Sequence, residues 1–150
     1  MSFSIILVPV SGLPANEEAI RLACQIARQD KAKVLATHVI EVQRNLPLDS
    51  ENAEKVERGE TILQHADKVA KTVKGTVESE LLQARVAGSA LVNEAIERGV
   101  DLIIVGVPYH SPLGDFQLGA TTLYILKNAP CRVWLIRELP PAENPKTASA

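Results

Sequence analysis

The chain has 150 residues, 46% of them hydrophobic but only 3% aromatic, and its formal net charge is −2. This length fits one domain with a substantial core, and the small negative charge argues against a nucleic-acid partner. No apolar run approaches the ~18 residues of a membrane span, and residues 1–4 lack the basic start of a signal peptide. We therefore expect a cytoplasmic protein without a membrane partner.

The first elements along the chain are predicted as strand, helix and strand. Residues 5–10 are apolar at every position, which is typical of a strand buried on both faces. Pro14 suits a first helical position, and an apolar stripe extends from there to about residue 29, so a helix follows. A second apolar strand covers residues 34–40.

The middle of the chain continues this alternation. Apolar residues recur at steps of three and four over residues 53–75, which predicts a long helix. Residues 76–84 alternate in polarity, as in a strand at the side of a sheet. A helix from residue 88 ends at Gly99 in the usual cap position, and residues 101–106 form a fourth strand, again apolar.

The last elements follow a loop over residues 107–117. A fourth helix ends at Pro130, and residues 131–137 form the fifth strand. Residues 138–150 carry three prolines among small residues and are predicted to be a flexible tail. The folded α/β domain is therefore expected to span residues 1–137.

Strands that alternate with helices require right-handed crossovers and a parallel sheet. Because the first and fourth strands are the most apolar, we predict a single doubly wound five-stranded parallel sheet, order 3-2-1-4-5, with helices on both faces. Ligands bind such a sheet beyond the carboxyl ends of the strands where the winding reverses. The candidate site therefore comprises residues 10–12 and 106–121.

Glycines mark the loop before the fourth helix. Gly114 and Gly119, followed by Ala120 and Thr121, nearly match a P-loop, but Ala120 stands where that motif requires lysine. The sequence therefore argues against a P-loop hydrolase. Backbone amides at the helix start could hold an anion, and a turn that only connects strand and helix fits the spacing equally well.

Four segments, in chain order, resemble the universal stress protein family. They are Ile6-Leu7-Val8-Pro9-Val10, Ala87-Gly88-Ser89-Ala90, Asp101-Leu102-Ile103-Ile104-Val105-Gly106 and Asn128-Ala129-Pro130-Cys131-Arg132-Val133. The resemblance extends from about residue 4 to residue 137, and the last segment is the most specific. The resemblance implies a stress-response accessory protein with a Rossmann-like fold of the adenine nucleotide alpha hydrolase type.

The resemblance also implies a nucleotide pocket, with departures from the family pattern. ATP-binding members carry G-x2-G-x9-G-[ST] after the fourth strand and an aspartate at the end of the first. Gly106 and Gly119 match, but Tyr109 replaces the second glycine, Ala120 the hydroxyl residue and Ser11 the aspartate. Bulk at one position and a lost hydroxyl at another predict a degenerate pocket. We therefore expect no tightly bound cofactor, with weak binding of ATP or AMP left open.

The resemblance assigns the remaining site residues. Val39 would border an adenine, with a core valine as the alternative interpretation, and Thr121 or Thr122 could supply a displaced hydroxyl. The predicted nucleotide-site residues are Val10, Ser11, Val39, Gly106, Gly119, Ala120 and Thr121. No metal ligand is predicted.

Histidine and cysteine positions do not predict catalysis. We interpret His38 as a core or sheet-end residue, His65 as a surface residue and His110, beside Ser111, as part of the pocket mouth. None belongs to a recognised triad or metal spacing, so no catalytic residue is assigned. Cys24 and Cys131 lack C-x-x-C spacing, and we interpret both as reduced core residues.

The last strand is apolar on both faces, although the predicted order leaves it at an edge. Exposed apolar edges pair with other chains, and the resemblance implies the same. We expect a homodimer in which this strand pairs with its counterpart, with Val133, Trp134 and Leu135 in the interface. The alternative is a monomer in which Trp134 packs against the fourth helix.

Two functions follow from these observations. The first is a non-catalytic accessory protein that acts through a dimer surface and protein partners, and the second is an ATP or AMP sensor with slow or no hydrolysis. A response regulator is excluded because Pro9, Val10, Ser11 and Ala84 occupy the regions where that class needs acidic residues. A flavin carrier is disfavoured because this chain has few aromatic residues to stack on the ring.

Overall fold

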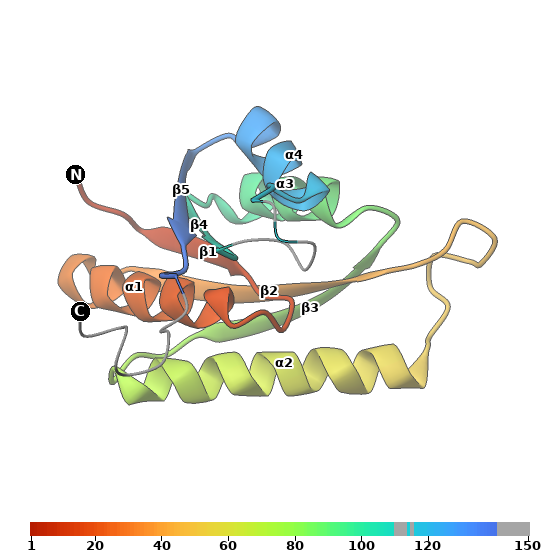
Figure 1. Cartoon of the computed structure of the whole chain (residues 1–150), viewed down its shortest axis with the longest axis horizontal. Coiled ribbons are helices and arrows are strands. Elements are labelled where there is room, and N and C mark those ends of the chain that lie inside the picture. Colours follow the sequence, from red (N-terminus) through yellow and green to blue (C-terminus); the bar gives the residue numbers. More distant parts are fainter. Residues whose placement is uncertain (110–113, 115, 141–150) are drawn as a thin grey trace.

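A computed structural model describes residues 1–109, 114 and 116–140 (Figure 1). Strands and helices alternate along the chain, as predicted. The elements are β1 (Ile5–Pro9), α1 (Ala15–Asp30), β2 (Lys33–Glu41), α2 (Ala53–Thr72), β3 (Glu78–Ala84), α3 (Ala87–Arg98), β4 (Leu102–Val107), α4 (Ala120–Asn128) and β5 (Arg132–Arg137). All strand pairs are parallel, and the five-stranded sheet has the order β3-β2-β1-β4-β5, which confirms the predicted topology.

Helices cover both faces of this sheet, with α1 and α2 on one side and α3 and α4 on the other (Figure 1). Successive side chains of a strand point to opposite faces, so β1 contributes to two cores. Ile6 and Val8 pack with residues of α1 and α2, whereas Leu7 packs with Leu91 of α3 and Ile125 of α4. All five side chains are almost completely buried. The central strands are therefore enclosed, and functional groups are confined to the strand ends and the loops.

Element boundaries differ from the predictions by one to three residues, and the end of α2 gives a physical reason. The helix ends at Thr72, not near Gly75. A Cβ on Gly75 would lie 2.6 Å from Cβ of Cys24, so this glycine permits α1 to approach closely. Gly75 also closes the helix end, because its N–H donates to the Ala70 carbonyl oxygen at 2.8 Å.

The two cysteines are free and differ in burial. Cys24 is buried in the core as predicted, whereas Cys131 lies just before β5 and is only half-buried, so the prediction of a core residue was too strong there. Burial raises the pKa of the Cys24 thiol, and burial with the nearby charge of Asp101 raises that of Cys131. Both thiols are therefore poor nucleophiles near neutral pH.

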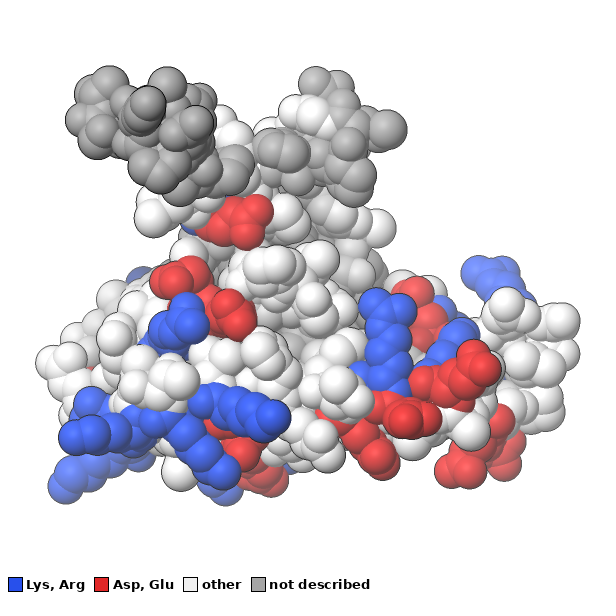
Figure 2. Space-filling model, turned by 60° about the horizontal axis from the view of Figure 1, so that its bottom comes forward, with Lys and Arg blue, Asp and Glu red and all other residues white. Residues whose placement is uncertain are grey.

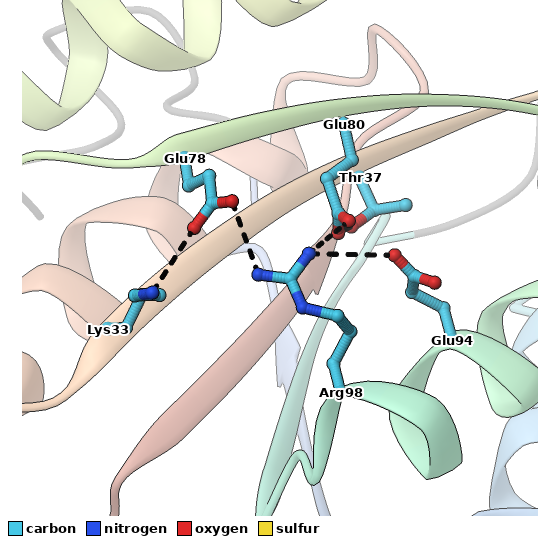
Figure 3. Close-up of polar contacts among 6 residues, drawn as sticks. All are labelled: Lys33, Thr37, Glu78, Glu80, Glu94 and Arg98. Carbon is cyan, nitrogen blue, oxygen red and sulfur yellow. Dashed lines mark hydrogen bonds and ion pairs between the residues drawn. The ribbon is translucent and has the colours of Figure 1, made fainter.

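A polar network ties α3 to the outer strands β2 and β3 (Figure 3). Its members are Lys33, Thr37, Glu78, Glu80, Glu94 and Arg98. The Arg98 guanidinium lies 2.6 Å from a carboxylate oxygen of Glu80, and the Thr37 hydroxyl donates to the other oxygen at 3.1 Å. Thr37 is only 1% exposed, so this hydrogen bond satisfies a hydroxyl that would otherwise be buried at a cost.

The predicted tail, residues 138–150, lies outside the described residues except for 138–140. The Glu138 N–H donates to the Val107 carbonyl oxygen at 2.8 Å, which extends the β4–β5 pairing by one residue. In the described part of the chain, none of the helices is both long enough and apolar enough to span a membrane.

Candidate functional site

A cavity of about 520 Å³ opens beyond the carboxyl ends of β1, β2 and β4, where the winding of the sheet reverses. Every predicted nucleotide-site residue lines it: Val10, Ser11, Val39, Gly106, Gly119, Ala120 and Thr121. Its volume lies within the range of about 300–1,000 Å³ that is typical of ligand pockets. The structure thus brings these residues together, and their role in binding stays a prediction.

The loop between β1 and α1 forms one wall, and Asn16 fixes its shape. The Asn16 side-chain oxygen accepts hydrogen bonds from the N–H groups of Ser11 at 2.8 Å and of Leu13 at 3.1 Å. Gly12 lies between them with φ of +89°, a conformation that favours glycine. Sequence reasoning missed Asn16, because a lone asparagine in the first turn of a helix carries no distinctive signal.

The start of α4 forms the opposite wall and exposes backbone donors. Gly119 is the N-cap, and no side chain caps the helix. The first N–H groups of an α-helix have no partner within the helix, and together with the helix dipole they attract anions. Ala120, Thr121 and Thr122 of this first turn all line the cavity. Free backbone N–H groups are therefore expected at this wall of the cavity, although Ala120 adds no hydroxyl to it.

Tyr109 lies away from the cavity, which corrects the expectation that its bulk obstructs the approach of phosphate. Its side chain lines a separate depression together with Gly114, Phe116 and Arg137. The Arg137 guanidinium carbon lies 5.1 Å from the centre of the tyrosine ring, and the Tyr109 N–H donates to a Glu138 carboxylate oxygen at 3.0 Å. Replacement of the motif's second glycine by tyrosine therefore does not fill this pocket.

The end of β2 supplies two further residues of the wall. Val39 is half-buried, packs against the core beneath α3 and lines the cavity, so the two interpretations of this residue are compatible. His38 Nδ1 lies 2.8 Å from the Val10 carbonyl oxygen. Because a carbonyl oxygen only accepts, Nδ1 carries the proton and the histidine holds the ends of β1 and β2 together, as expected of a sheet-end residue.

Of the other two histidines, the structure describes only His65. His65 is on the surface as predicted, with Nε2 2.7 Å from a Glu17 carboxylate oxygen. His110 and Ser111 lie outside the described residues. Within the residues that the structure describes, no cluster of three or more His, Cys, Asp or Glu side chains could hold a metal ion.

The predicted interface residues lie on β5, whose pairing with β4 leaves its other side at the edge of the sheet. Val133 and Trp134 are half-buried, and Leu135 is 38% exposed. Trp134 packs edge to face against Phe3, with ring centres 5.6 Å apart. The alternative placement against α4 is therefore wrong, because Trp134 points to the face of the sheet that α1 covers.

The fold and the cavity define a class: a doubly wound α/β domain with a cavity and an uncapped helix start at its switch point. Within this class the chain belongs to the universal stress protein family, whose model matches residues 2–137. It is 27% identical over 139 residues to a universal stress protein of Methanocaldococcus jannaschii, an alignment that covers 89% of this chain and 81% of that protein.

Solved structures of other members share the fold. The universal stress protein of Archaeoglobus fulgidus in complex with dAMP superposes with a TM-score of 0.73 at 18% identity, covering 91% of this chain and 99% of that one. A family member from Arabidopsis thaliana with AMP bound gives a TM-score of 0.64 at 17% identity, covering 98% and 99%. At these identities the comparison shows the fold alone.

Proposed function

We propose that this chain is a non-catalytic, cytoplasmic stress-response accessory protein that acts as a homodimer and binds an adenine nucleotide weakly. The main observation in favour of a nucleotide ligand is the cavity at the switch point, which is lined by the uncapped start of α4 and by the adjoining end of β2. The dAMP and AMP complexes of structurally similar proteins support an adenine nucleotide as the ligand class. The free cysteines suit a reducing compartment, and cell fractionation that finds the protein outside the cytoplasm would refute this localisation.

Weak affinity follows from what the cavity lacks. Ser11 and Ala120 replace the aspartate and the hydroxyl residue of the ATP-binding pattern, so the ligand forms fewer side-chain hydrogen bonds. We expect a dissociation constant for ATP or AMP on the order of 1 mM, which corresponds to about −4 kcal/mol.

Isothermal titration calorimetry with ATP and magnesium, and with AMP, tests this expectation. The same samples, incubated with ATP and assayed for ADP, should show no turnover above buffer alone. The position of Tyr109 outside the cavity favours a second candidate, an ATP or AMP sensor with slow or no hydrolysis. Micromolar affinity would establish the sensor and contradict the accessory role, and sustained ADP formation would contradict the non-catalytic assignment.

Support for the homodimer comes from the edge position of β5 and the exposed Leu135. In an interface between two copies of β5, a charged residue at position 135 would be desolvated and opposed by its counterpart. We therefore expect the wild type to sediment as a dimer at micromolar concentration and Leu135→Glu as a monomer. Leu48→Glu, in the loop before α2 and 49% exposed, is the matched control and should remain dimeric. A wild type that sediments as a monomer throughout would end the dimer proposal.

A further inference from the structure

The cavity continues past the end of β2 into a second depression of about 360 Å³, here named the side pocket. Residues common to both linings are Ser11, His38, Val39, Glu41, Ala87 and Thr121. The side pocket adds Ile40 and two cationic residues of α2, Lys55 and Arg58. Thr121, in the first turn of α4, therefore lies in the same depression as both cations.

The positive charges of the side pocket are not neutralised by carboxylates. Lys55 Nζ donates to the Glu41 backbone carbonyl oxygen at 3.2 Å. Arg58 forms no ion pair with any residue in the described part of the chain. Glu41 contributes the one carboxylate of the lining, and this group accepts a hydrogen bond from the Ala87 N–H at 2.9 Å.

This arrangement is unusual for α2, given its sequence. Glu54 precedes Arg58 by four residues within the helix, a spacing at which opposite charges can pair. No ion pair between these two residues forms, whereas Lys71 of the same helix pairs with Asp67 at 3.0 Å. Over this side of the molecule, acidic and basic side chains alternate along the first part of α2, while basic ones gather where α1 and α2 end (Figure 2). The cations of the side pocket are thus available to a ligand.

We infer that Lys55 and Arg58 supply the charge that holds the phosphate of the nucleotide in this site, an inference that rests on the proposed function. The first turn of α4 offers backbone donors and the hydroxyl groups of Thr121 and Thr122, but no positive charge. Thr121 lines the same depression as the α2 cations, so a phosphate at this helix start would share the depression with them. Lysine binds phosphate as a point charge, and arginine binds it as a bidentate hydrogen-bond donor. The site then selects a phosphorylated adenine nucleotide over the uncharged nucleoside.

Calorimetry with AMP and adenosine on three proteins tests the inference. Lys55→Gln/Arg58→Gln removes both charges from surface positions and retains good helix formers. Lys68→Gln/Lys74→Gln removes two charges beyond the cavity and is the matched control. We expect the first variant to bind AMP about tenfold more weakly than the wild type, with unchanged adenosine binding. Its AMP affinity should also depend less on salt.

The calorimetric results distinguish a failure of this inference from a failure of the proposed function. Equal AMP affinity in the wild type and Lys55→Gln/Arg58→Gln would overturn the inference and leave the proposed function standing. An equal loss in the control variant would also overturn it, because the effect would then reflect overall charge. A wild type that binds neither AMP nor adenosine would overturn both the proposed function and the inference.

Discussion

Gly106 and Gly119 both match the ATP-binding pattern, but the structure requires only one of them. A Cβ on Gly106 would lie 2.1 Å from the Ala15 carbonyl oxygen, so glycine is needed where β4 passes the start of α1, with or without a ligand. At Gly119 no heavy atom of the described residues, its two chain neighbours aside, lies within 4 Å of a Cβ, and its φ of −69° suits any residue. Gly119 is therefore the more informative residue for ligand binding, because packing does not explain it.

Single substitutions test separately whether weak AMP binding comes from the missing hydroxyl at position 120 or from the bulk of Tyr109. Ala120→Ser adds a hydroxyl to the cavity wall, and one net hydrogen bond of about 0.5–1.5 kcal/mol should strengthen AMP binding roughly threefold to tenfold. Tyr109→Gly should leave the affinity unchanged, because the tyrosine lies beside Arg137 outside the cavity. Calorimetry on both variants checks this, and a large gain from Tyr109→Gly alone would restore the steric explanation.

At the scale of elements, strand and helix identities were predictable because the hydrophobic pattern is unambiguous. Residues 5–10 and 102–106 are apolar on both faces, and the resulting central strands are enclosed by helices. The candidate cavity was predictable from topology, since the switch point follows from strand order. Asn16 was not predictable, because a lone asparagine in a first helical turn carries no distinctive signal, although its contacts are local. Lys55 and Arg58 were not predictable as lining residues, because their place depends on elements distant in the sequence. The direction of Tyr109 was missed for the same reason.

The network between α3 and β3 should make stability depend on pH. A hydrogen bond with Glu80, burial and the charge of Glu80 raise the pKa of Glu94 to about 7. A carboxyl whose pKa is higher in the folded state stabilises the fold below its unfolded pKa of about 4.3. This contribution disappears as pH rises through about 7. After allowance for solvent screening, it is on the order of 1 kcal/mol.

Glu94→Gln mimics the protonated side chain and should remove this dependence. Urea unfolding between about pH 5 and pH 8 should show the variant gaining stability relative to the wild type as pH rises. Glu57→Gln, at an exposed position of α2 outside this network, is the control. If the free energies of unfolding of Glu94→Gln and the wild type change in parallel with pH, the raised pKa of Glu94 is refuted.

At the scale of the whole molecule, one end of the sheet carries the features argued to bind the nucleotide. The carboxyl ends of β1, β2 and β4, the start of α4 and the first turns of α2 surround the cavity and the side pocket. A smaller cavity of about 260 Å³ lies between α1 and α2 and is lined by Ile20, Ile62 and Val69 among others. This second space is mainly apolar, and its polar lining includes Glu17 together with His65 and Thr61. No residue of the α4 start lines it.

Mapping AMP on the protein by amide NMR tests the central claim most directly. With AMP at concentrations that saturate the calorimetric signal, the largest shifts should fall on the amides of Ser11, Gly106 and Thr121, which line the cavity. The amides of Ile62 and Val69 should move little. Shifts concentrated between α1 and α2, or spectra unchanged by AMP, would contradict a nucleotide site at the switch point of this sheet.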